Sequence, residues 1–348
     1  MSRQSPPAIN ASSLLKVENL NVDFELRGQN YSAVDALSLH VQAGETVAIV
    51  GESGSGKSVT SLAIMGLIRK PGIVRSGNVW FKDKDLLTLP SHQRRKYLGS
   101  DISMVFQEPA VSLNPSFTVG SQITEVLRLH LKMSRAECRK RALELLHEVG
   151  ISDPETCLNS WPHQLSGGMN QRVMIAMAIS CHPALLIADE PTTALDVTVQ
   201  AQILRLLQQL QKKKNMAMIF ITHDLSLVPG MAHRVAVMYA GQVVESCAVD
   251  DLFQAPLHPY TEALLKSLPA HHRIANERLS TIKGSPPRAG EEFTGCRFHS
   301  RCNYAIDRCS QSSPELVSDP HSDDRLFRCF YPLARTRAES SWLTGQTR

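Results

Sequence analysis

The sequence predicts an α/β fold in which helices cover a parallel sheet. Apolar runs of strand length alternate with helical patterns on both sides of residues 120–182, and such alternation favours a parallel sheet covered by helices. Residues 120–182 themselves show helical spacing with almost no strand signal, which indicates a helical insertion inside the α/β domain. The 348 residues allow one large domain with an appendage, or two domains.

Strand patterns dominate the first part of the chain. The segment LLKVENLNVDFEL alternates as a strand does. The following AVDALSLHVQAGETVAIVGESGSGKS indicates strand, turn, strand and glycine-rich loop, with residues 47–50 suited to a buried strand. We expect a helix in VTSLAIMGLI and short strands in GNVWFKDKDLL and ISMVFQEP.

The insertion and the second half of the domain come next. Helices are expected in GSQITEVLRLHLK, SRAECRKRALELLHEVG and GGMNQRVMIAMAISC, after which strands and helices alternate again from ALLIADE to RVAVMYAGQVVES. We place one large α/β domain at residues 14–268, with a core at 14–108 and 183–268 and a helical subdomain at about 109–182. Residues 269–348 are expected to form a loop-rich extension that holds a cluster of four cysteines.

Composition narrows the class of protein. At 43% hydrophobic and 20% charged residues the chain is globular, and its net charge of +4 gives no argument for a nucleic-acid partner. The sequence contains no run of about 18 apolar residues, so we expect no membrane span. The polar start MSRQSPPAINASS lacks the apolar segment of a secretory signal. We therefore expect a cytosolic protein, in which thiols are kept reduced.

The segment GESGSGKS at residues 51–58 predicts a phosphate site. It fits G-x-x-x-x-G-K-[ST] and lies between an apolar strand and a helix, where backbone N–H groups and a helix N-terminus face an anion. Lys57 would reach the β- and γ-phosphates, and the Ser58 hydroxyl would bind Mg²⁺. The residues that we expect around the phosphates are Gly51, Ser53, Gly54, Ser55, Gly56, Lys57, Ser58 and Val59.

Two carboxylates follow the apolar strand in ALLIADE. Asp189 is placed to hold the magnesium shell, and Glu190 is placed to polarise the attacking water. Two carboxylates at a strand end are common by themselves, but together with a phosphate loop they indicate nucleotide hydrolysis.

The segment LSGGMNQR at residues 165–172, with SMVFQEP before it and FITHD after it, resembles the ATP-binding subunits of ABC transporters. The resemblance covers roughly residues 14–268 and implies a P-loop NTPase with a RecA-like sheet core that hydrolyses ATP with Mg²⁺. It also implies a head-to-tail dimer with two ATP molecules between the subunits. Residues implied to act across that dimer are Ser166, Gly167 and Gly168, at the γ-phosphate of the facing site, and Asp196, at the interface.

The same resemblance assigns further residues. Gln107 is implied to sense magnesium and the attacking water, and His223 to hold the γ-phosphate and order Glu190. An aromatic side chain near the first strand is implied to stack on adenine. Phe24 fits this place best, with Tyr31 as the alternative and a packed core phenylalanine as the competing interpretation.

Finer similarity indicates the peptide-importer branch. The segments MVFQEPAVSLNPSFTVGSQI and HPYTEALLKSLP look like those of dipeptide and oligopeptide transporter ATPases, and the cysteine-bearing tail resembles the end of the dipeptide-importer subunit. This implies a motor that energises import of di- or oligopeptides, or of a related small solute, at the cytoplasmic face of the inner membrane. The implied partners are a second, related ATPase subunit, two membrane permeases and an external solute-binding protein. A soluble ABC ATPase of a non-transport machine is the alternative.

Four tail cysteines, Cys296, Cys302, Cys309 and Cys329, equal the number of ligands of a tetrahedral metal or a [4Fe–4S] cluster. Five residues separate the first two and six separate the next two, whereas zinc ligands usually lie two to four residues apart. Members of the dipeptide branch are similar to proteins with an iron–sulfur cluster in this tail. We therefore rank a [4Fe–4S] cluster first, free thiols second and zinc third, and expect Arg297, Arg301, Arg308 and Arg328 to offset the thiolate charge.

Overall fold

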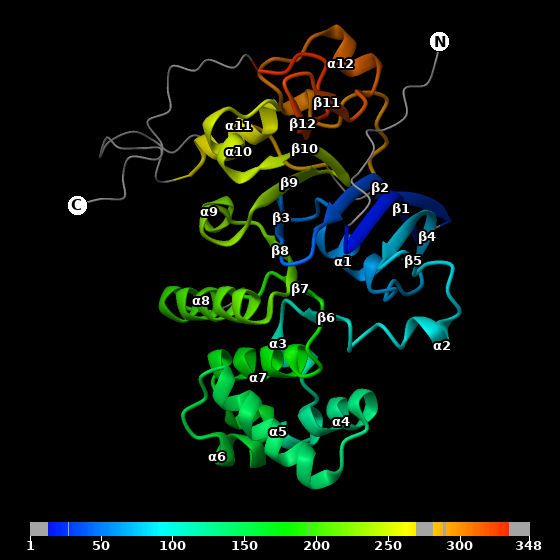
Figure 1. Ribbon diagram of the computed structural model, residues 1–348. Helices are drawn as coiled ribbons and strands as arrows, with labels where there is room; N and C mark the ends of the chain where they lie inside the picture. Colours follow the sequence, from blue (N-terminus) through cyan, green and yellow to red (C-terminus); the bar gives the residue numbers. More distant parts are fainter. Residues whose placement is uncertain (1–12, 27, 194, 269–280, 288–289, 334–348) are drawn as a thin grey trace, which may run out of the picture. The chain divides into compact units, whose positions relative to one another are not determined.

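The structure is a computed structural model that describes residues 13–26, 28–193, 195–268, 281–287 and 290–333 (Figure 1). The chain divides into two compact units. Of the described residues, those within 1–40, 47–84 and 222–348 belong to the first, and those within 41–46 and 85–221 to the second. Parts of the expected C-terminal extension, at 269–280, 288–289 and 334–348, lie outside the described residues.

A four-stranded sheet near the N-terminus belongs mainly to the first unit. Its order is β2 (Gln29–Val41), β1 (Leu15–Leu26), β4 (Gly72–Phe81) and β5 (Lys84–Asp85). β1 and β4 run antiparallel, and Leu15, Val17, Leu20 and Val22 of β1 are fully buried, as a strand with one face on a core requires. The register shifts after Glu18, where Gly77 approaches so closely that a Cβ would lie 2.6 Å from the Asn19 carbonyl oxygen.

A second group of strands in the first unit carries the phosphate loop. Neighbouring strands are β11 (Val317–Asp319), β12 (Ser322–Phe327), β10 (Gln242–Ala248), β9 (Arg234–Tyr239) and β3 (Thr46–Val50). β3 and β9 are parallel and the remaining pairs are antiparallel. The helices of this unit are α1 (Lys57–Ile64), α9 (Val228–Met231), α10 (Val249–Gln254), α11 (Pro259–Lys266) and α12 (Asp307–Gln311), with 3-10 turns η2 (Leu225–Leu227) and η4 (His299–Arg301).

The second unit is built on three parallel strands. Their order is β8 (Ala217–Thr222), β7 (Leu185–Asp189) and β6 (Ile102–Val105), and every residue in them is buried, which is typical of parallel strands covered on both faces. The helices are α2 (Ser91–Arg94), α3 (Pro109–Ser112), α4 (Val119–Leu131), α5 (Arg135–Glu148), α6 (Pro154–Asn159), α7 (Gly167–Ile179) and α8 (Val197–Lys214), with the turn η1 (Pro162–Gln164).

Side-chain caps explain where the long helices of the second unit begin. Ser134 and Glu137 form a capping box at the start of α5. Thr118 accepts a hydrogen bond from the Ser121 N–H at the start of α4, and Asp196 accepts one from the Val199 N–H at the start of α8. Among the described residues, no helix combines the length and the apolarity that a bilayer span requires.

The α/β class is confirmed, and the described part of the loop-rich tail also contains short strands that its sequence does not indicate. Strands β11 and β12 form a hairpin, and β12 extends the sheet through Glu245 of β10, opposite Phe327. The segment SDDRLF has three charged residues in six and no strand alternation, so its sequence gave no strand signal. Its pairing depends on a tertiary partner, since Arg325 of β12 is buried against Glu245.

Candidate nucleotide-binding site

The phosphate loop lies between β3 and α1 in the first unit. Lys57, the first residue of α1, has 4% of its surface exposed, and its Nζ donates hydrogen bonds to the carbonyl oxygens of Gly51 (2.8 Å) and Glu52 (3.0 Å). The ammonium group is thus held inside the loop by the loop's own backbone. Ser58 and Val59 follow in the first turn of α1 and are half-buried.

Close backbone approach explains two of the glycines. A Cβ on Gly51 would lie 2.2 Å from the Met238 carbonyl oxygen, and one on Gly56 would lie 2.6 Å from the Ala33 carbonyl oxygen, so neither position tolerates a side chain. Ser55 is buried, its carbonyl accepts from the Gly241 N–H at 2.9 Å, and its Oγ has no hydrogen-bond partner among the described residues. Ser53 and Gly54 are exposed at the top of the loop.

The two aromatic candidates for adenine lie in different surroundings. Phe24 is half-buried in β1, and its ring fits against Gly72 of β4, where a Cβ would come within 2.8 Å of the ring. Tyr31 of β2 is also half-buried, its hydroxyl donates to Gln29, and its ring packs on Gly290.

The second unit brings Gln107 and Glu190 together. Asp189 ends β7 with 4% of its surface exposed, and Glu190 follows with φ of 44° and an N–H bonded to the Ile221 carbonyl. The Glu190 carboxylate accepts hydrogen bonds from Gln107 Nε2 (3.2 Å) and Thr193 Oγ1 (3.1 Å). These two donors fix the orientation of the Glu190 carboxylate. A carboxylate that takes a proton from a water molecule needs such a fixed orientation.

The LSGGM residues lie at the beginning of α7 in the second unit. Ser166 is the N-cap, its Oγ accepts from the Met169 N–H (3.3 Å), and it is exposed together with Gly167. Gly168 lies against α8, because a Cβ there would be 2.8 Å from Val199 Cγ1. Asp196, the N-cap of α8, is exposed as well.

His223 directly follows β8 and is exposed. The division of the chain places it in the first unit with the phosphate loop, whereas Gln107, Asp189 and Glu190 belong to the second unit. The candidate residues are therefore divided between the two units, and the structure describes the contacts of each group within its own unit.

The four tail cysteines line one small cavity in the first unit. Its other walls include His258, Phe298, Tyr304 and Phe330, and its volume is about 20 Å³. All four are free thiols, Cys309 is buried and the other three are half-buried. Burial raises the pKa of the thiols of Cys296 and Cys302, and raises the pKa of Cys329 to about 11.

The cavity does not match a site for one metal ion. Among the described residues, no three His, Cys, Asp or Glu side chains are arranged to hold one ion. This observation supports neither the zinc alternative nor a preformed cluster site.

The tail arginines were predicted to offset thiolate charge, and the structure gives them other partners. Arg301 binds Glu52 of the phosphate loop, Arg297 pairs with Asp35, and Arg308 lies over the Phe330 ring. Arg328 donates to the Val243 carbonyl. The sequence places an arginine beside each of the four cysteines, but this pattern does not indicate the distant residues that the arginines contact.

Comparisons with known proteins agree with this geometry. Residues 34–193 match the family described as "ABC transporter", and residues 244–309 match "Oligopeptide/dipeptide transporter, C-terminal region". Among solved structures, the dimeric post-hydrolysis state of the ATP-binding cassette MJ0796 bound to ADP and Pi aligns with a TM-score of 0.61 and 30% identity, covering 68% of this chain and 98% of that one. A phosphate loop, a strand-end carboxylate pair and an LSGGM helix on this fold define an ATP-binding cassette ATPase.

Relatives over almost the full length narrow the class. The chain is 51% identical over 321 residues to the "Dipeptide transport ATP-binding protein DppD" of Escherichia coli (strain K12), covering 92% of this chain and 97% of the relative. It is 52% identical over 322 residues to the "Oligopeptide transport ATP-binding protein AppD" of Bacillus subtilis (strain 168), with 92% and 97% covered. The chain belongs to the family of ATP-binding subunits of dipeptide and oligopeptide ABC transporters.

Proposed function

We propose that this chain hydrolyses ATP to energise the import of dipeptides or oligopeptides through an ABC transporter. One observation carries the proposal: every ATPase motif is intact in a chain that is about half identical, over nearly its full length, to peptide transport ATP-binding proteins. We take residues 14–268 as the ATPase domain, with a helical subdomain at about 109–182, and residues 269–348 as the extension.

ATP binding is assigned to both units. The phosphates would lie in the backbone N–H groups of the phosphate loop, at the N-terminus of α1, with Lys57 Nζ as the cation. Phe24 would stack on adenine, because its ring is only half-buried in β1. Magnesium would be held by Ser58, Asp189 and Gln107, whose hydroxyl, carboxylate and amide oxygens are the hard donors that this ion prefers. When bound, the ion neutralises charge that develops on the phosphate oxygens.

Hydrolysis is assigned to Glu190 as the general base that orients and polarises water. Its carboxylate is already held by Gln107 and Thr193, so little reorganisation is needed when ATP arrives. His223 would hold the γ-phosphate. In the transition state the charge is redistributed over the equatorial oxygens of the transferred phosphoryl group and the leaving oxygen. A donor aimed at these oxygens would therefore bind the transition state more tightly than the bound substrate.

The exposed starts of α7 and α8 support pairing with a second ATPase subunit. Ser166, Gly167 and Gly168 present the N-terminus of a 13-residue helix, which is suited to the γ-phosphate bound by the facing subunit. Asp196 would cross the same interface. A homologous but different subunit is the partner that we propose.

Helix α4 offers a surface for a membrane permease. Seven residues line a shallow hollow of about 600 Å³: Ser121, Thr124, Glu125, Arg128, Leu129, Lys132 and Met133. Leu129, which lines the hollow, is 71% exposed, and Phe117 in the neighbouring segment is 54% exposed. We propose that this hollow and the segment 112–124 receive a short helix from one of two permeases. The ATPase would then lie on the cytoplasmic face of the inner membrane, with an external solute-binding protein supplying the peptide.

Replacing Glu190 by Gln tests the catalytic part. The variant keeps its hydrogen-bond geometry but cannot accept a proton, so ATP binding should persist while turnover falls by roughly 100-fold or more. Glu155→Gln, at an exposed helix position, is the matched control and should hydrolyse ATP normally. Unchanged hydrolysis by Glu190→Gln contradicts the assignment. Membrane fractionation and co-purification with permeases test the transport part, and a chain that fractionates alone contradicts it.

For the tail we propose a [4Fe–4S] cluster bound by Cys296, Cys302, Cys309 and Cys329. The support is that four free thiols line one cavity of the tail, and that a cluster of this type takes four thiolate ligands. When bound, the cluster would cross-link the tail. Anaerobic purification with iron and sulfide analysis should give four of each per chain. One equivalent of zinc without iron rejects the proposal.

A further inference from the structure

Glu52, the second residue of the phosphate loop, is bound by an arginine from the tail. Its Oε2 accepts a hydrogen bond from Arg301 Nη1 (2.6 Å), and its Oε1 accepts one from Nη2 (3.0 Å). The arginine side chain is 4% exposed and the glutamate side chain 24%. A two-pronged contact of this kind fixes the distance and the relative plane of both groups.

The remaining polar groups of Glu52 are also bonded. Its N–H donates to the Tyr260 hydroxyl (3.0 Å), and its carbonyl accepts from Lys57 Nζ (3.0 Å) and from the Ser55 N–H (3.2 Å). Tyr260 belongs to α11 and Arg301 to the turn η4, so two of these partners come from residues beyond the ATPase strands. The first turn of the phosphate loop is therefore shaped from the C-terminal region.

Arg301 is itself held in place. Its Nε donates to the Lys283 carbonyl (2.9 Å), and its Nη1 lies 3.3 Å from the Tyr239 hydroxyl. It is the last residue of the turn His299–Arg301 and directly precedes Cys302, one of the four cavity cysteines. The guanidinium thus has a single available position, unlike that of a solvated surface arginine.

Aromatic rings pack beside the partly buried contact, and Arg301 lies over the Tyr239 ring at 5.7 Å. The rings of Tyr239 and Tyr260 lie 4.7 Å apart, and both pack on Phe298, at 5.2 Å and 5.3 Å. An ion pair in such surroundings is weakly screened, whereas an exposed pair contributes little.

We propose that Arg301 is a positioning residue for nucleotide binding, through which the C-terminal tail holds the phosphate loop in its binding conformation. Because the Glu52 carbonyl accepts a hydrogen bond from Lys57 Nζ, the guanidinium acts on the ammonium that meets the phosphates through one intervening residue. Loss of the contact frees Glu52 to move, and ATP must then order the loop as it binds. The cost of this ordering lowers affinity for ATP without removing any group that touches it.

Nucleotide affinity of the full-length chain tests the proposal. Arg301→Met removes the charge but keeps most of the packing volume, and it should bind the non-hydrolysable analogue AMP-PNP roughly tenfold more weakly. In steady-state hydrolysis KM for ATP should rise while kcat changes little, because the reacting groups are untouched. Arg308→Met is the matched control, an arginine of the same tail beside Cys309 that lies over Phe330 and not on the loop. It should bind AMP-PNP as the original chain does.

The glutamate side of the pair provides a second variant. Glu52→Gln should weaken AMP-PNP binding to a similar extent, and the double variant with Arg301→Met should be no worse than either single one. Arg301→Lys keeps the charge but not the fork, so its affinity for AMP-PNP should lie between those of the original chain and Arg301→Met. Normal affinity in Arg301→Met, equal loss in Arg308→Met, or additive losses in the double variant would each overturn the proposal.

Reciprocity gives a readout that a merely structural arginine would not change. If the tail favours nucleotide binding, nucleotide must in turn stabilise the tail by the same factor. Amide exchange in residues 296–302 should slow when AMP-PNP is added to the original chain, and this slowing should be lost in Arg301→Met. Equal slowing in both proteins contradicts the proposal.

Discussion

Two glutamates, one in each unit, differ in burial and in the kind of donor that surrounds the carboxylate. Glu245 of β10, in the first unit, is fully buried and accepts hydrogen bonds from Arg325 Nη2 (2.7 Å) and from the N–H groups of Leu257 (2.8 Å) and His258 (2.9 Å). The donors come from two segments of the C-terminal half, residues 257–258 and strand β12. The site depends on all of them.

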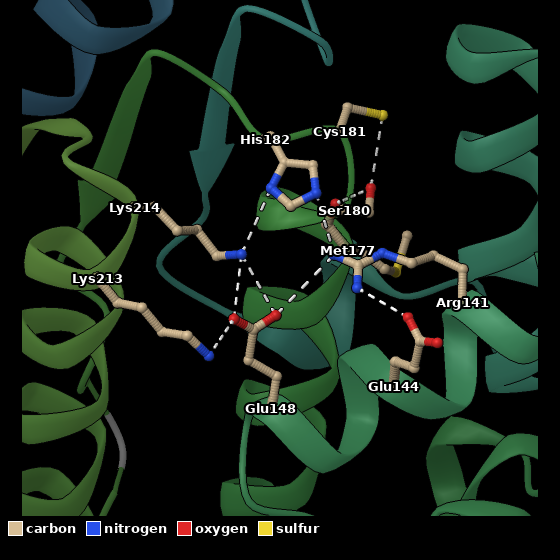
Figure 2. Close-up of polar contacts among 9 residues, drawn as sticks. All are labelled: Arg141, Glu144, Glu148, Met177, Ser180, Cys181, His182, Lys213 and Lys214. Atoms are coloured by element: carbon tan, nitrogen blue, oxygen red, sulfur yellow. Dashed lines mark hydrogen bonds and ion pairs between the residues drawn. The ribbon is translucent and has the colours of Figure 1, made fainter.

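Glu148, at the end of α5 in the second unit, lies among interchangeable cations. Figure 2 shows the carboxylate facing Lys213, Lys214 and Arg141, at N–O distances of 3.3, 3.1 and 4.0 Å. Burial alone would raise its pKa, but the hydrogen bonds and charges of Lys214 and Lys213 outweigh this and lower it. The Lys213 side chain is 72% exposed, so water competes for its ammonium.

The comparison separates ion pairs that fix one local arrangement from ion pairs that do not. A buried pair with backbone donors allows one arrangement, and its cost appears when one partner is removed. A partly exposed cluster tolerates the loss of one cation, because the others and water replace it. The contact between Arg301 and Glu52 lies between the two kinds, because the Arg301 side chain is 4% exposed and the Glu52 side chain 24%. Its two-pronged geometry is why we assign it a role in positioning the loop.

Arg325→Met should give the largest effect on stability. Glu245 would remain buried without its cation, and we expect the free energy of unfolding in denaturant to fall by about 3–5 kcal/mol. Adding Glu245→Gln removes the stranded charge and should recover a large part of that loss. A loss below about 1 kcal/mol, or no recovery in the double variant, would mean that Glu245 is no more dependent on its partner than Glu148.

Sequence reasoning found the parts of the site that are contiguous in the chain. The phosphate loop, the pair Asp189 and Glu190, and the LSGGM segment each combine residue types and local structure within a few positions, so the pattern itself carries the chemistry. The hydrogen bond from Gln107 to Glu190 joins residues 83 positions apart, and only the family resemblance indicated that both serve one site.

Contacts of the tail could not be predicted in this way. Glu52 and Arg301 are 249 positions apart, and neither has a neighbour that indicates the other. Strand β12 has the charged segment SDDRLF, whose burial makes sense only with Glu245 in place as a partner for Arg325. Local patterns report propensity and amphipathicity, whereas these elements depend on a tertiary partner.

Glu148→Gln should have a smaller effect that depends on salt. We expect the free energy of unfolding to fall by about 1 kcal/mol at low ionic strength, with the difference shrinking as salt screens the lysines. Lys213→Ala should be nearly silent, because Lys214 and Arg141 remain. Glu155→Gln, which breaks an exposed pair with Arg139, serves as the reference for a surface contact. A salt-independent loss as large as that of Arg325→Met contradicts the comparison.

His182 should give the smallest effect, and its signature is pH. Its ring lies between Lys214 Nζ (3.5 Å) and Arg141 Nη2 (3.2 Å) (Figure 2). Burial first, and then these two cations, lower its pKa, against an opposing contribution from Glu148. The unfolded chain therefore binds a proton more readily than the folded one. Stability should fall as the pH drops below about 6.5, and this fall should end once the folded histidine is protonated too.

His182→Asn isolates this contribution, because it removes the titration and keeps a polar side chain at the same place. Its stability should vary less with pH between about 6.5 and 5 than that of the original chain, as measured by denaturant unfolding at each pH. The lowered pKa of Glu148 acts in a separate window, since its contribution is present above its ordinary pKa and is lost only as the pH falls through the folded value. Identical profiles for the variant and the original chain above pH 5 would show that folding does not lower the pKa of His182.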